Sequence, residues 1–136
     1  MTLEVGFSVT HRRYVPYSHA HYGGDLVDGA YGLALFGDVA TDLAIHTDGD
    51  ESLLAGYSSV EFLAPIQAGD VVEVTASVTR IGTRSRDLSF EARVLCRAAP
   101  ERGPSAADVL DPPILATKAS ATIVVPPKAA GGSAPA

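Results

Sequence analysis

The sequence predicts an α+β domain in which one antiparallel β-sheet wraps around a single long helix. Residues 29–46 carry apolar side chains at helical spacing around nearly the whole helix, so other structure has to cover it. The flanking segments alternate apolar and polar residues, as strands with one buried face do. The length of 136 residues is enough for one such domain and too short for a separate cofactor-binding domain.

The N-terminal part contains one predicted strand and one irregular segment. Between residues 3 and 10 every second residue is apolar, which predicts a strand with one buried face. Residues 11–22 are rich in aromatic residues and histidine and include Pro16, which interrupts regular strand pairing. We therefore expect an irregular connection from residue 11 to the start of the helix.

The helix itself is predicted from its spacing and its end signals. Phe36 and Leu43 belong to a series of apolar residues at helical spacing within residues 29–46. Asp28 is a good N-cap, because its short carboxylate can accept hydrogen bonds from N–H groups of the first turn. Residues 47–50, with the sequence TDGD, are a typical helix stop.

The rest of the chain predicts further strands and a tail. Two of the strands form a hairpin across Gly82, and the four prolines of residues 98–113 predict a long loop before the last strand. Residues 126–136 are rich in proline, alanine and glycine, so we expect a disordered tail after a domain of residues 1–125. The strands are expected at residues 56–64, 71–82, 85–96 and 114–125.

Composition and charge exclude several classes of function. The net charge of -6 and the pI near 5.0 argue against a nucleic-acid partner, which requires clustered basic residues. No apolar stretch reaches the roughly 18 residues of a membrane span, and the N-terminus lacks a signal-peptide pattern, so we expect no membrane partner. Cys96 is the only cysteine, which excludes an intramolecular disulfide and indicates a reducing, cytoplasmic location.

Two carboxylates are candidates for proton transfer. Asp38 lies on an apolar flank of the helix with Asp42 one turn later, and burying a carboxylate there is costly unless it is paired or protonated. It is either a general acid or base, or an exposed acid on the one polar strip of the helix. Alternation places Glu61 on the strand face of Tyr57 and Leu63, where it is either a surface acid or a second pocket carboxylate.

The segment before the helix offers weaker signals. His19 and His21 are two residues apart, so one of them is a candidate for proton transfer, or one packs or caps locally while the other faces solvent. We expect no metal site, because two histidines at this spacing need further ligands from distant residues. Gly23, Gly24 and Gly29 lie near the helix N-terminus, where open N–H groups can hold a carbonyl oxygen that gains negative charge. The alternative is an ordinary tight turn.

Three arginines surround the turn of the predicted hairpin. They form either a solvated hairpin end or a contact to an anionic part of a ligand. They are Arg80, Arg84 and Arg86.

Several motifs resemble the 3-aminobutyryl-CoA ammonia-lyases, which are hotdog-fold enzymes related to the β-alanyl-CoA ammonia-lyases. The resemblance covers roughly residues 18–125 and implies a single hotdog domain, in agreement with the helix wrapped by a sheet. The motifs are HAHYGGDLVDGA (residues 19–30), FGDVAT (36–41), DGD (48–50), SVEFLAP (59–65) and AGD (68–70), with FEAR (90–93) and PSAADVL (104–110) in support.

The resemblance implies a carbon–nitrogen lyase that reversibly eliminates ammonia from a short-chain 3-aminoacyl-CoA to give the 2-enoyl-CoA. Such a site needs donors for the thioester oxygen, a base for the α-proton and an acid for the leaving amine. The implied catalytic residues are Asp38, Glu61 and His21. The implied substrate-binding residues are Tyr22, Gly24, Asp25, Gly29, Ala30, Tyr57, Arg84 and Arg86.

The resemblance also implies the partners. Coenzyme A enters only as part of the substrate, with no other cofactor and no metal, and an acyl-carrier protein is an alternative carrier. We expect a homodimer, or a hexamer built as a trimer of dimers, because a single curved sheet leaves an edge and part of the helix uncovered. Two other functions stay open: an acyl-CoA thioesterase on the same fold, and a dimer that binds an acyl-CoA or another small ligand without converting it.

Overall fold

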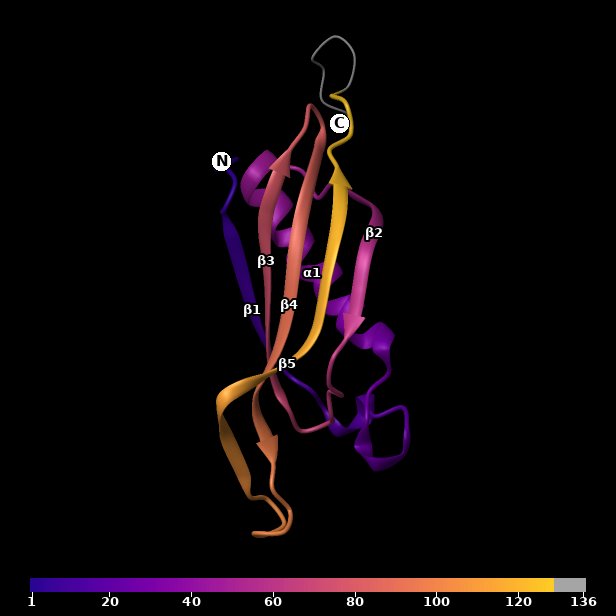
Figure 1. Ribbon diagram of the computed structural model, residues 1–136, viewed down its shortest axis with the longest axis vertical. Helices are drawn as coiled ribbons and strands as arrows, with labels where there is room; N and C mark the ends of the chain where they lie inside the picture. Colours follow the sequence, from indigo (N-terminus) through magenta and orange to yellow (C-terminus); the bar gives the residue numbers. More distant parts are fainter. Residues whose placement is uncertain (129–136) are drawn as a thin grey trace, which may run out of the picture.

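The protein folds as a five-stranded antiparallel sheet with one long helix across one face (Figure 1). The computed structural model describes residues 1–128. Strand order is β1-β3-β4-β5-β2, so β1 and β2 are the two edges. The elements are β1 (Ser8–Tyr14), α1 (Gly29–Asp48), β2 (Leu53–Phe62), β3 (Val71–Ile81), β4 (Ser85–Ala98) and β5 (Ala107–Val124), with short 3-10 turns at Tyr17–His19 and Gly23–Asp25.

This architecture confirms the predicted α+β fold with its central helix. Of the predicted tail, residues 129–136 lie outside the described part of the chain. Among residues 1–128, no helix is long and apolar enough to span a membrane.

Helix α1 starts and ends close to where the sequence predicts. The Asp28 carboxylate accepts a hydrogen bond from the Tyr31 N–H at 2.9 Å, which confirms it as the N-cap. The helix ends at Asp48, two residues later than predicted, because Gly49 adopts a left-handed conformation with φ of 65°. On the buried side Phe36 stacks on Phe90 of β4, with ring centroids 4.9 Å apart. The helix is therefore anchored at the centre of the sheet.

The first strand lies further along the chain than predicted. Val5 is 63% exposed and Gly6 has a positive φ of 94°, so the chain turns there instead of extending. Strand β1 begins at Ser8 and continues to Tyr14, through residues that were expected to be irregular. The reason is antiparallel pairing with β3, from Ser8 opposite Ser77 to Tyr14 opposite Val71, which satisfies the backbone of β1 along one side.

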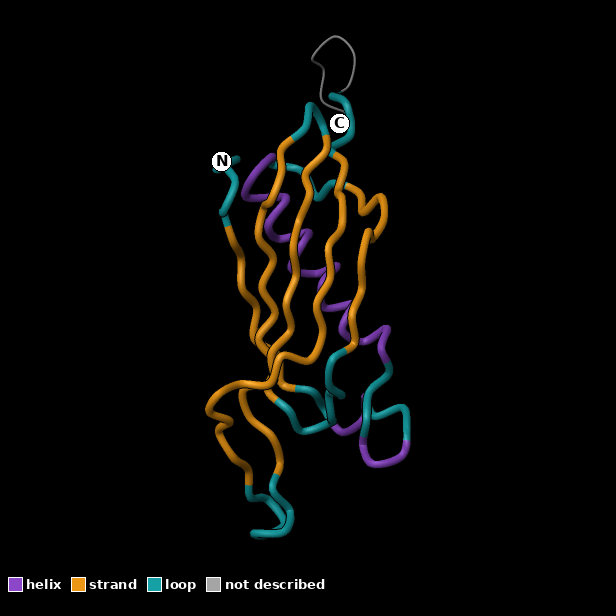
Figure 2. Tube along the Cα trace, in the orientation of Figure 1, coloured by secondary structure: helices purple, strands orange, loops and turns teal. Residues whose placement is uncertain are grey.

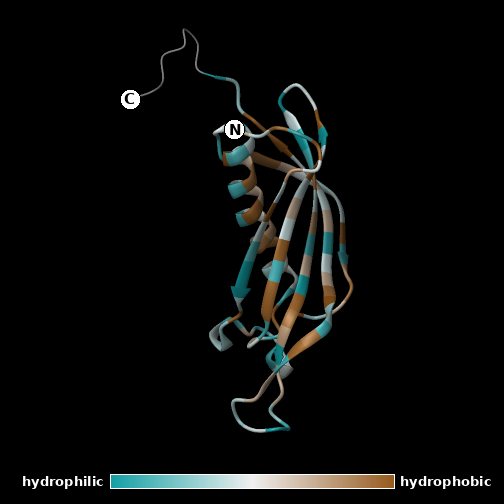
Figure 3. Cartoon of the chain, turned by 90° about the vertical axis from the view of Figure 1, so that its left-hand side faces the viewer, coloured by the Kyte–Doolittle hydropathy of each residue, from teal (hydrophilic) through white to brown (hydrophobic). Residues whose placement is uncertain are grey.

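The central hairpin of β3 and β4 has the predicted alternation. Val72, Val74 and Ala76 of β3 are buried, whereas the intervening residues face away from the helix, and the strands show the same alternation in Figure 3. Strand β5 begins at Ala107 instead of residue 114, because its first part pairs with the end of β4. The pair forms an arm that extends beyond the sheet (Figure 2). Only residues 99–106 of the predicted loop connect the two strands.

A bulge in β2 changes which residues share a face. Tyr57 lies opposite Ala121, and Ser59 lies opposite Ser120, so Ser58 is an extra residue in the strand. Beyond the bulge Val60 lies opposite the buried Ala119, whereas Glu61 lies opposite Lys118. The prediction that Tyr57 and Glu61 share a face is therefore wrong.

A buried ion pair joins the end of α1 to the turn between β3 and β4. The Arg86 guanidinium donates to both carboxylate oxygens of Asp48, at 2.8 and 3.2 Å, and also to the carbonyls of Gly82 and Ser85. Burial raises the pKa of Asp48, but hydrogen bonds from Arg86 and Thr47 outweigh it and hold this pKa below 3.8. The pair fixes the helix C-terminus against the hairpin.

A second ion pair joins the segment after β2 to the arm. Asp70 is fully buried, and the Arg97 guanidinium donates to its two carboxylate oxygens, each at 2.9 Å. Arg97 also donates to the Pro65 carbonyl, and the Gln67 N–H donates to Asp70. These contacts position residues 65–70 beside the start of α1.

Replacing Arg86 with Met is expected to lower the free energy of unfolding by about 3 kcal/mol, because Asp48 would stay buried without its cation. Urea unfolding measures the loss. The double variant Asp48→Asn with Arg86→Met is the matched control and should recover most of it, since no unpaired charge remains. An Arg86→Met protein as stable as the wild type would contradict this role.

Acid should destabilise the fold partly through Asp48. Its pKa is lower in the folded than in the unfolded protein, so the unfolded chain binds more protons, and this stability is present above 3.8 and lost as the pH falls below that value. We expect a steeper decline in unfolding free energy below pH 4 for the wild type than for Asp48→Asn. Chemical denaturation at a series of pH values compares the two slopes, and identical slopes would disprove the contribution.

Candidate active site

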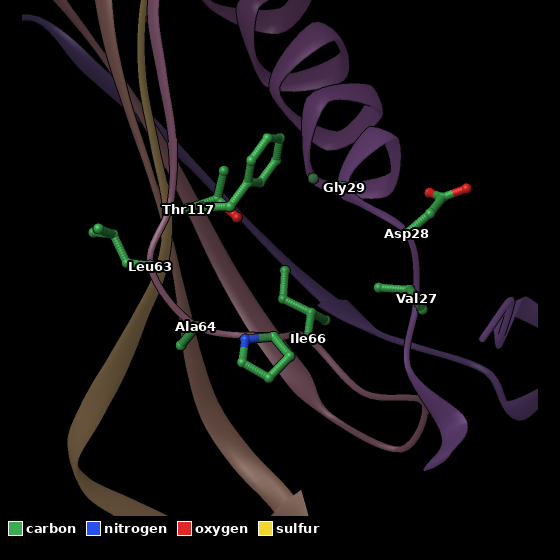
Figure 4. A pocket seen from close by; sticks show the side chains of 10 residues that line it. Val27, Asp28, Gly29, Leu63, Ala64, Ile66 and Thr117 are labelled. Atoms are coloured by element: carbon green, nitrogen blue, oxygen red, sulfur yellow. The ribbon is translucent and has the colours of Figure 1, made fainter. Parts of the chain in front are cut away.

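A cavity of about 330 Å³ lies where the start of α1 faces the end of β2 (Figure 4). The helix start, the segment after β2 and one residue of β5 enclose it. The lining residues are Val27, Asp28, Gly29, Gly32, Phe62, Leu63, Ala64, Pro65, Ile66 and Thr117.

The walls of the cavity are apolar and approach the helix closely. Phe62 and Leu63 are 59% and 53% exposed, whereas Val27 and Ile66 are buried. A Cβ atom added at Gly29 would lie 3.0 Å from the Phe62 ring, so only glycine leaves this space open. The cavity is therefore suited to a small apolar group beside a helix N-terminus.

The polar groups of the cavity are donors. The first N–H groups of a helix have no acceptor within the helix, and Gly29, the first residue of α1, lines the cavity. Thr117 is 3% exposed, and Figure 4 shows its hydroxyl oxygen pointing toward the space beside Gly29. Asp28 is the one titratable lining residue, but its carboxylate caps Tyr31 and points away from Thr117. The arrangement can hold a carbonyl oxygen but lacks a base that points inward.

Of the predicted binding residues at the helix start, Gly29 lies in this cavity and the others do not. Ala30 is exposed outside it. Gly24 and Asp25 line a different cavity of about 710 Å³, between the loop before α1 and the arm. The structure thus divides the predicted glycine-rich cradle between two places.

His21 and Tyr22 lie on the exposed loop that leads to α1. The N–H groups of both residues donate to the Leu26 carbonyl, at 2.8 and 2.9 Å, and their rings pack edge to face with centroids 4.7 Å apart. His19 instead is held by the Tyr31 hydroxyl at 2.9 Å from its Nδ1. The loop therefore leaves the His21 and Tyr22 side chains open to solvent or to another molecule.

Asp38 lies away from the cavity. It is separated from Gly29 by roughly 14 Å along the helix at 1.5 Å per residue. Asp38 is exposed, as in the alternative of an acid on the polar strip of the helix, and it lines a smaller cavity of about 130 Å³ with His11 and Arg13 of β1. The neighbouring Asp42 contacts His11 at 2.7 Å and His46 at 3.1 Å, and these contacts hold the pKa of Asp42 below its usual value.

Glu61 lies on the opposite face of the sheet from α1. Beyond the bulge it is paired with Lys118, which is itself paired with Glu91, and this row faces away from the helix. Within one protomer the two candidate carboxylates, Asp38 and Glu61, are therefore not brought together. Tyr57 faces the helix side, with its ring 6.3 Å from that of Phe90, and burial raises the pKa of its phenol.

The structure does not support the predicted role of Arg86 in binding the substrate. Arg86 is 5% exposed, and its guanidinium donates to Asp48 and to two hairpin carbonyls. Arg84 is exposed in the turn between β3 and β4, and this turn and the start of α1 lie at opposite ends of the sheet (Figure 1).

Sequence reasoning missed Thr117 and Phe62. A signal existed for Thr117, because the inward-facing positions that follow it in β5 are all apolar: Ala119, Ala121 and Ile123. A lone polar residue at the start of such a series indicates a special role or a local partner. Phe62 was recognisable only as part of a motif.

Comparisons with known proteins agree with this geometry. Residues 24–98 match the family model of the thioesterase superfamily. A 3-aminobutyryl-CoA ammonia lyase of Acetoanaerobium sticklandii is 54% identical over 107 residues, which cover 79% of this chain and 85% of the relative. Structurally, β-alanyl-CoA:ammonia lyase from Clostridium propionicum matches with a TM-score of 0.84 and 33% identity, over 90% of this chain and 87% of that one.

A more distant structure shares the fold. A hexameric hotdog fold thioesterase of Campylobacter jejuni matches with a TM-score of 0.69 and 17% identity, over 84% of this chain and 79% of that one. Because the identity is low, this likeness concerns the fold alone. Taken with the closer relatives and the helix wrapped by a five-stranded sheet, it shows that the chain is a hotdog-fold member of the 3-aminobutyryl-CoA ammonia lyase family within the thioesterase superfamily.

Proposed function

We propose that the protein is a carbon–nitrogen lyase that reversibly eliminates ammonia from a short-chain 3-aminoacyl-CoA, such as 3-aminobutyryl-CoA, to give the 2-enoyl-CoA. The observation that carries this proposal is the 54% identity to a 3-aminobutyryl-CoA ammonia lyase over most of the chain. The cavity at the start of α1 supports it, because apolar walls and donors suit a short acyl thioester.

The chemistry requires three kinds of group. A base takes the proton from Cα, the C–H electron pair forms a double bond to the thioester carbon, and the carbonyl π pair moves onto oxygen. The charge then returns, a Cα=Cβ bond forms, and the Cβ–N electron pair leaves with nitrogen, which takes up a proton. Donors at the helix N-terminus stabilise the oxygen in the charged state. Coenzyme A belongs to the substrate, and in this proposal no further cofactor takes part.

We assign the base to Asp38 of a second copy. The cavity of one protomer lacks an inward-pointing base, and its own Asp38 lies roughly 14 Å away along the helix. Asp38 is exposed on the side of the helix that faces β1, so the subunit that receives it would contact this side, and pairing along β2 would join a further copy. His21 and Tyr22, exposed on the loop before α1, are the candidates for protonating the leaving amine.

The edge strand β2 is the surface on which a second copy would pair. It is hydrogen-bonded on one side only, by β5. It also exposes large apolar side chains at Leu53, Leu54 and Phe62, which is unusual for an edge open to water. Edge-to-edge pairing of two such strands would give a homodimer, and three dimers would give a hexamer.

Incubation with crotonyl-CoA and ammonium should consume the enoyl absorbance at a rate that depends on ammonium. The control is the same mixture without ammonium. Loss of absorbance without ammonium would instead indicate hydration, and release of free thiol would indicate a thioesterase. No reaction with any short enoyl-CoA would disprove the lyase proposal.

Mixed subunits test whether the site is shared. Asp38→Asn is expected to lower turnover at least about tenfold, because it removes the base. Gly29→Val should block the cavity, since a Cβ atom there meets Phe62. If Asp38 and the cavity come from different copies, refolding the two inactive variants together should restore about a quarter of the wild-type activity, because mixed dimers contain one intact site.

The control for this complementation is each inactive variant refolded alone or mixed with Glu101→Gln, an exposed arm residue outside the lining of the cavity. Absence of any recovery in the mixture of the two inactive variants would place Asp38 and the cavity in the same subunit or outside a common site.

A further inference from the structure

The hydroxyl of Thr117 faces the cavity and has no partner in the described part of the protein. Thr117 is 3% exposed and lines the cavity, and its hydroxyl forms no side-chain hydrogen bond within residues 1–128. A polar side chain is uncommon in an otherwise apolar wall, and its hydroxyl takes its partner from whatever occupies the cavity. Every later inward position of β5 is in fact apolar, which makes Thr117 an exception that calls for a ligand.

The position of the hydroxyl is set by two glycines of α1. The Oγ1 atom would lie 3.3 Å from a Cβ atom at Gly32, so the absence of a side chain there lets the hydroxyl approach the first helical turn. Gly29 leaves the space beside Phe62 open in the same way. Because Asp28 already satisfies the Tyr31 N–H, the donor left for a ligand at the cavity wall is the Gly29 N–H.

We propose that the Thr117 hydroxyl and the Gly29 N–H together bind the carbonyl oxygen of the CoA thioester, which rests on the proposed lyase function. When the base removes the Cα proton, the carbonyl π pair moves onto this oxygen, and the two donors stabilise the negative charge. When the Cβ–N pair leaves with nitrogen, the charge returns from the oxygen and the carbonyl re-forms. Thr117 donates a hydrogen bond throughout and transfers no proton.

The surroundings of Thr117 favour this role over simple filling of space. Phe62 is its neighbour on β2, and Ala92 is its neighbour on β4. With apolar neighbours on both sides, a donor acts in a low-dielectric environment, where its interaction with a developing charge is stronger than in water. A donor of this kind stabilises the enolate more than the substrate, so its loss lowers kcat more than affinity.

Thr117→Val is the decisive variant, because it keeps the shape and removes only the hydroxyl. We expect kcat for crotonyl-CoA amination to fall about 100-fold. The affinity for butyryl-CoA should fall only about fivefold. Affinity for the thioether S-butyl-CoA, which lacks the carbonyl, should be unchanged. Thr117→Ser keeps the hydroxyl and should restore kcat to within about threefold of the wild type.

Two further readouts separate this role from a structural one. The absorbance of bound crotonyl-CoA should shift to longer wavelength in the wild type and in Thr117→Ser, and not in Thr117→Val, because the shift reports polarisation of the carbonyl. Urea unfolding should show Thr117→Val to be at least as stable as the wild type, since it keeps the side-chain shape and removes a hydroxyl that has no protein partner.

The outcomes distinguish the two proposals. In one outcome the wild type binds butyryl-CoA more tightly than the thioether, Thr117→Val loses this preference, and the wild type aminates no enoyl-CoA. This result would support the carbonyl site and disprove the lyase. If the wild type and Thr117→Val aminate crotonyl-CoA with the same kcat, the carbonyl site is disproved and the lyase proposal is not affected. Equal affinity of the wild type for thioester and thioether would also overturn the carbonyl site.

Discussion

The packing of α1 against one face of the sheet is the constraint on which the rest of the structure depends. Phe36 and Phe90 stack where the helix crosses the central strands, and Val39 and Leu43 continue the contact as fully buried residues. Burial of such side chains stabilises a small domain by about 1.5–3 kcal/mol each. Because the helix is held at its centre, its two ends are carried to fixed places on the sheet.

Each end of the helix then meets a different chemical environment. At the C-terminus the Asp48 carboxylate and the Arg86 guanidinium neutralise each other, and the polar groups of the turn are satisfied. At the N-terminus Gly29 and Gly32 have no side chains. A Cβ atom at Gly29 would meet Phe62, and one at Gly32 would meet Thr117. One end is therefore closed and structural, while the other keeps a cavity with a donor in its wall.

The protomer by itself leaves the chemistry incomplete. Its cavity holds donors and apolar walls, while Asp38 lies far along the helix and Glu61 lies on the other face of the sheet. The β2 edge that borders the cavity exposes Phe62, and Leu63 follows it. In the proposed assembly a second copy covers this apolar edge, and small size is then compatible with catalysis.

The sequence alone determined the helix with its Asp28 cap, the β3–β4 hairpin and the fold class, because these features follow from local periodicity and capping. Its motifs also indicated the family. The tertiary structure decided the start of β1, the arm of β4 and β5, and the places of Glu61, Arg86 and Thr117. These depend on pairing between distant strands: one bulge at Ser58 reverses the face of Glu61, and no local pattern contains that information.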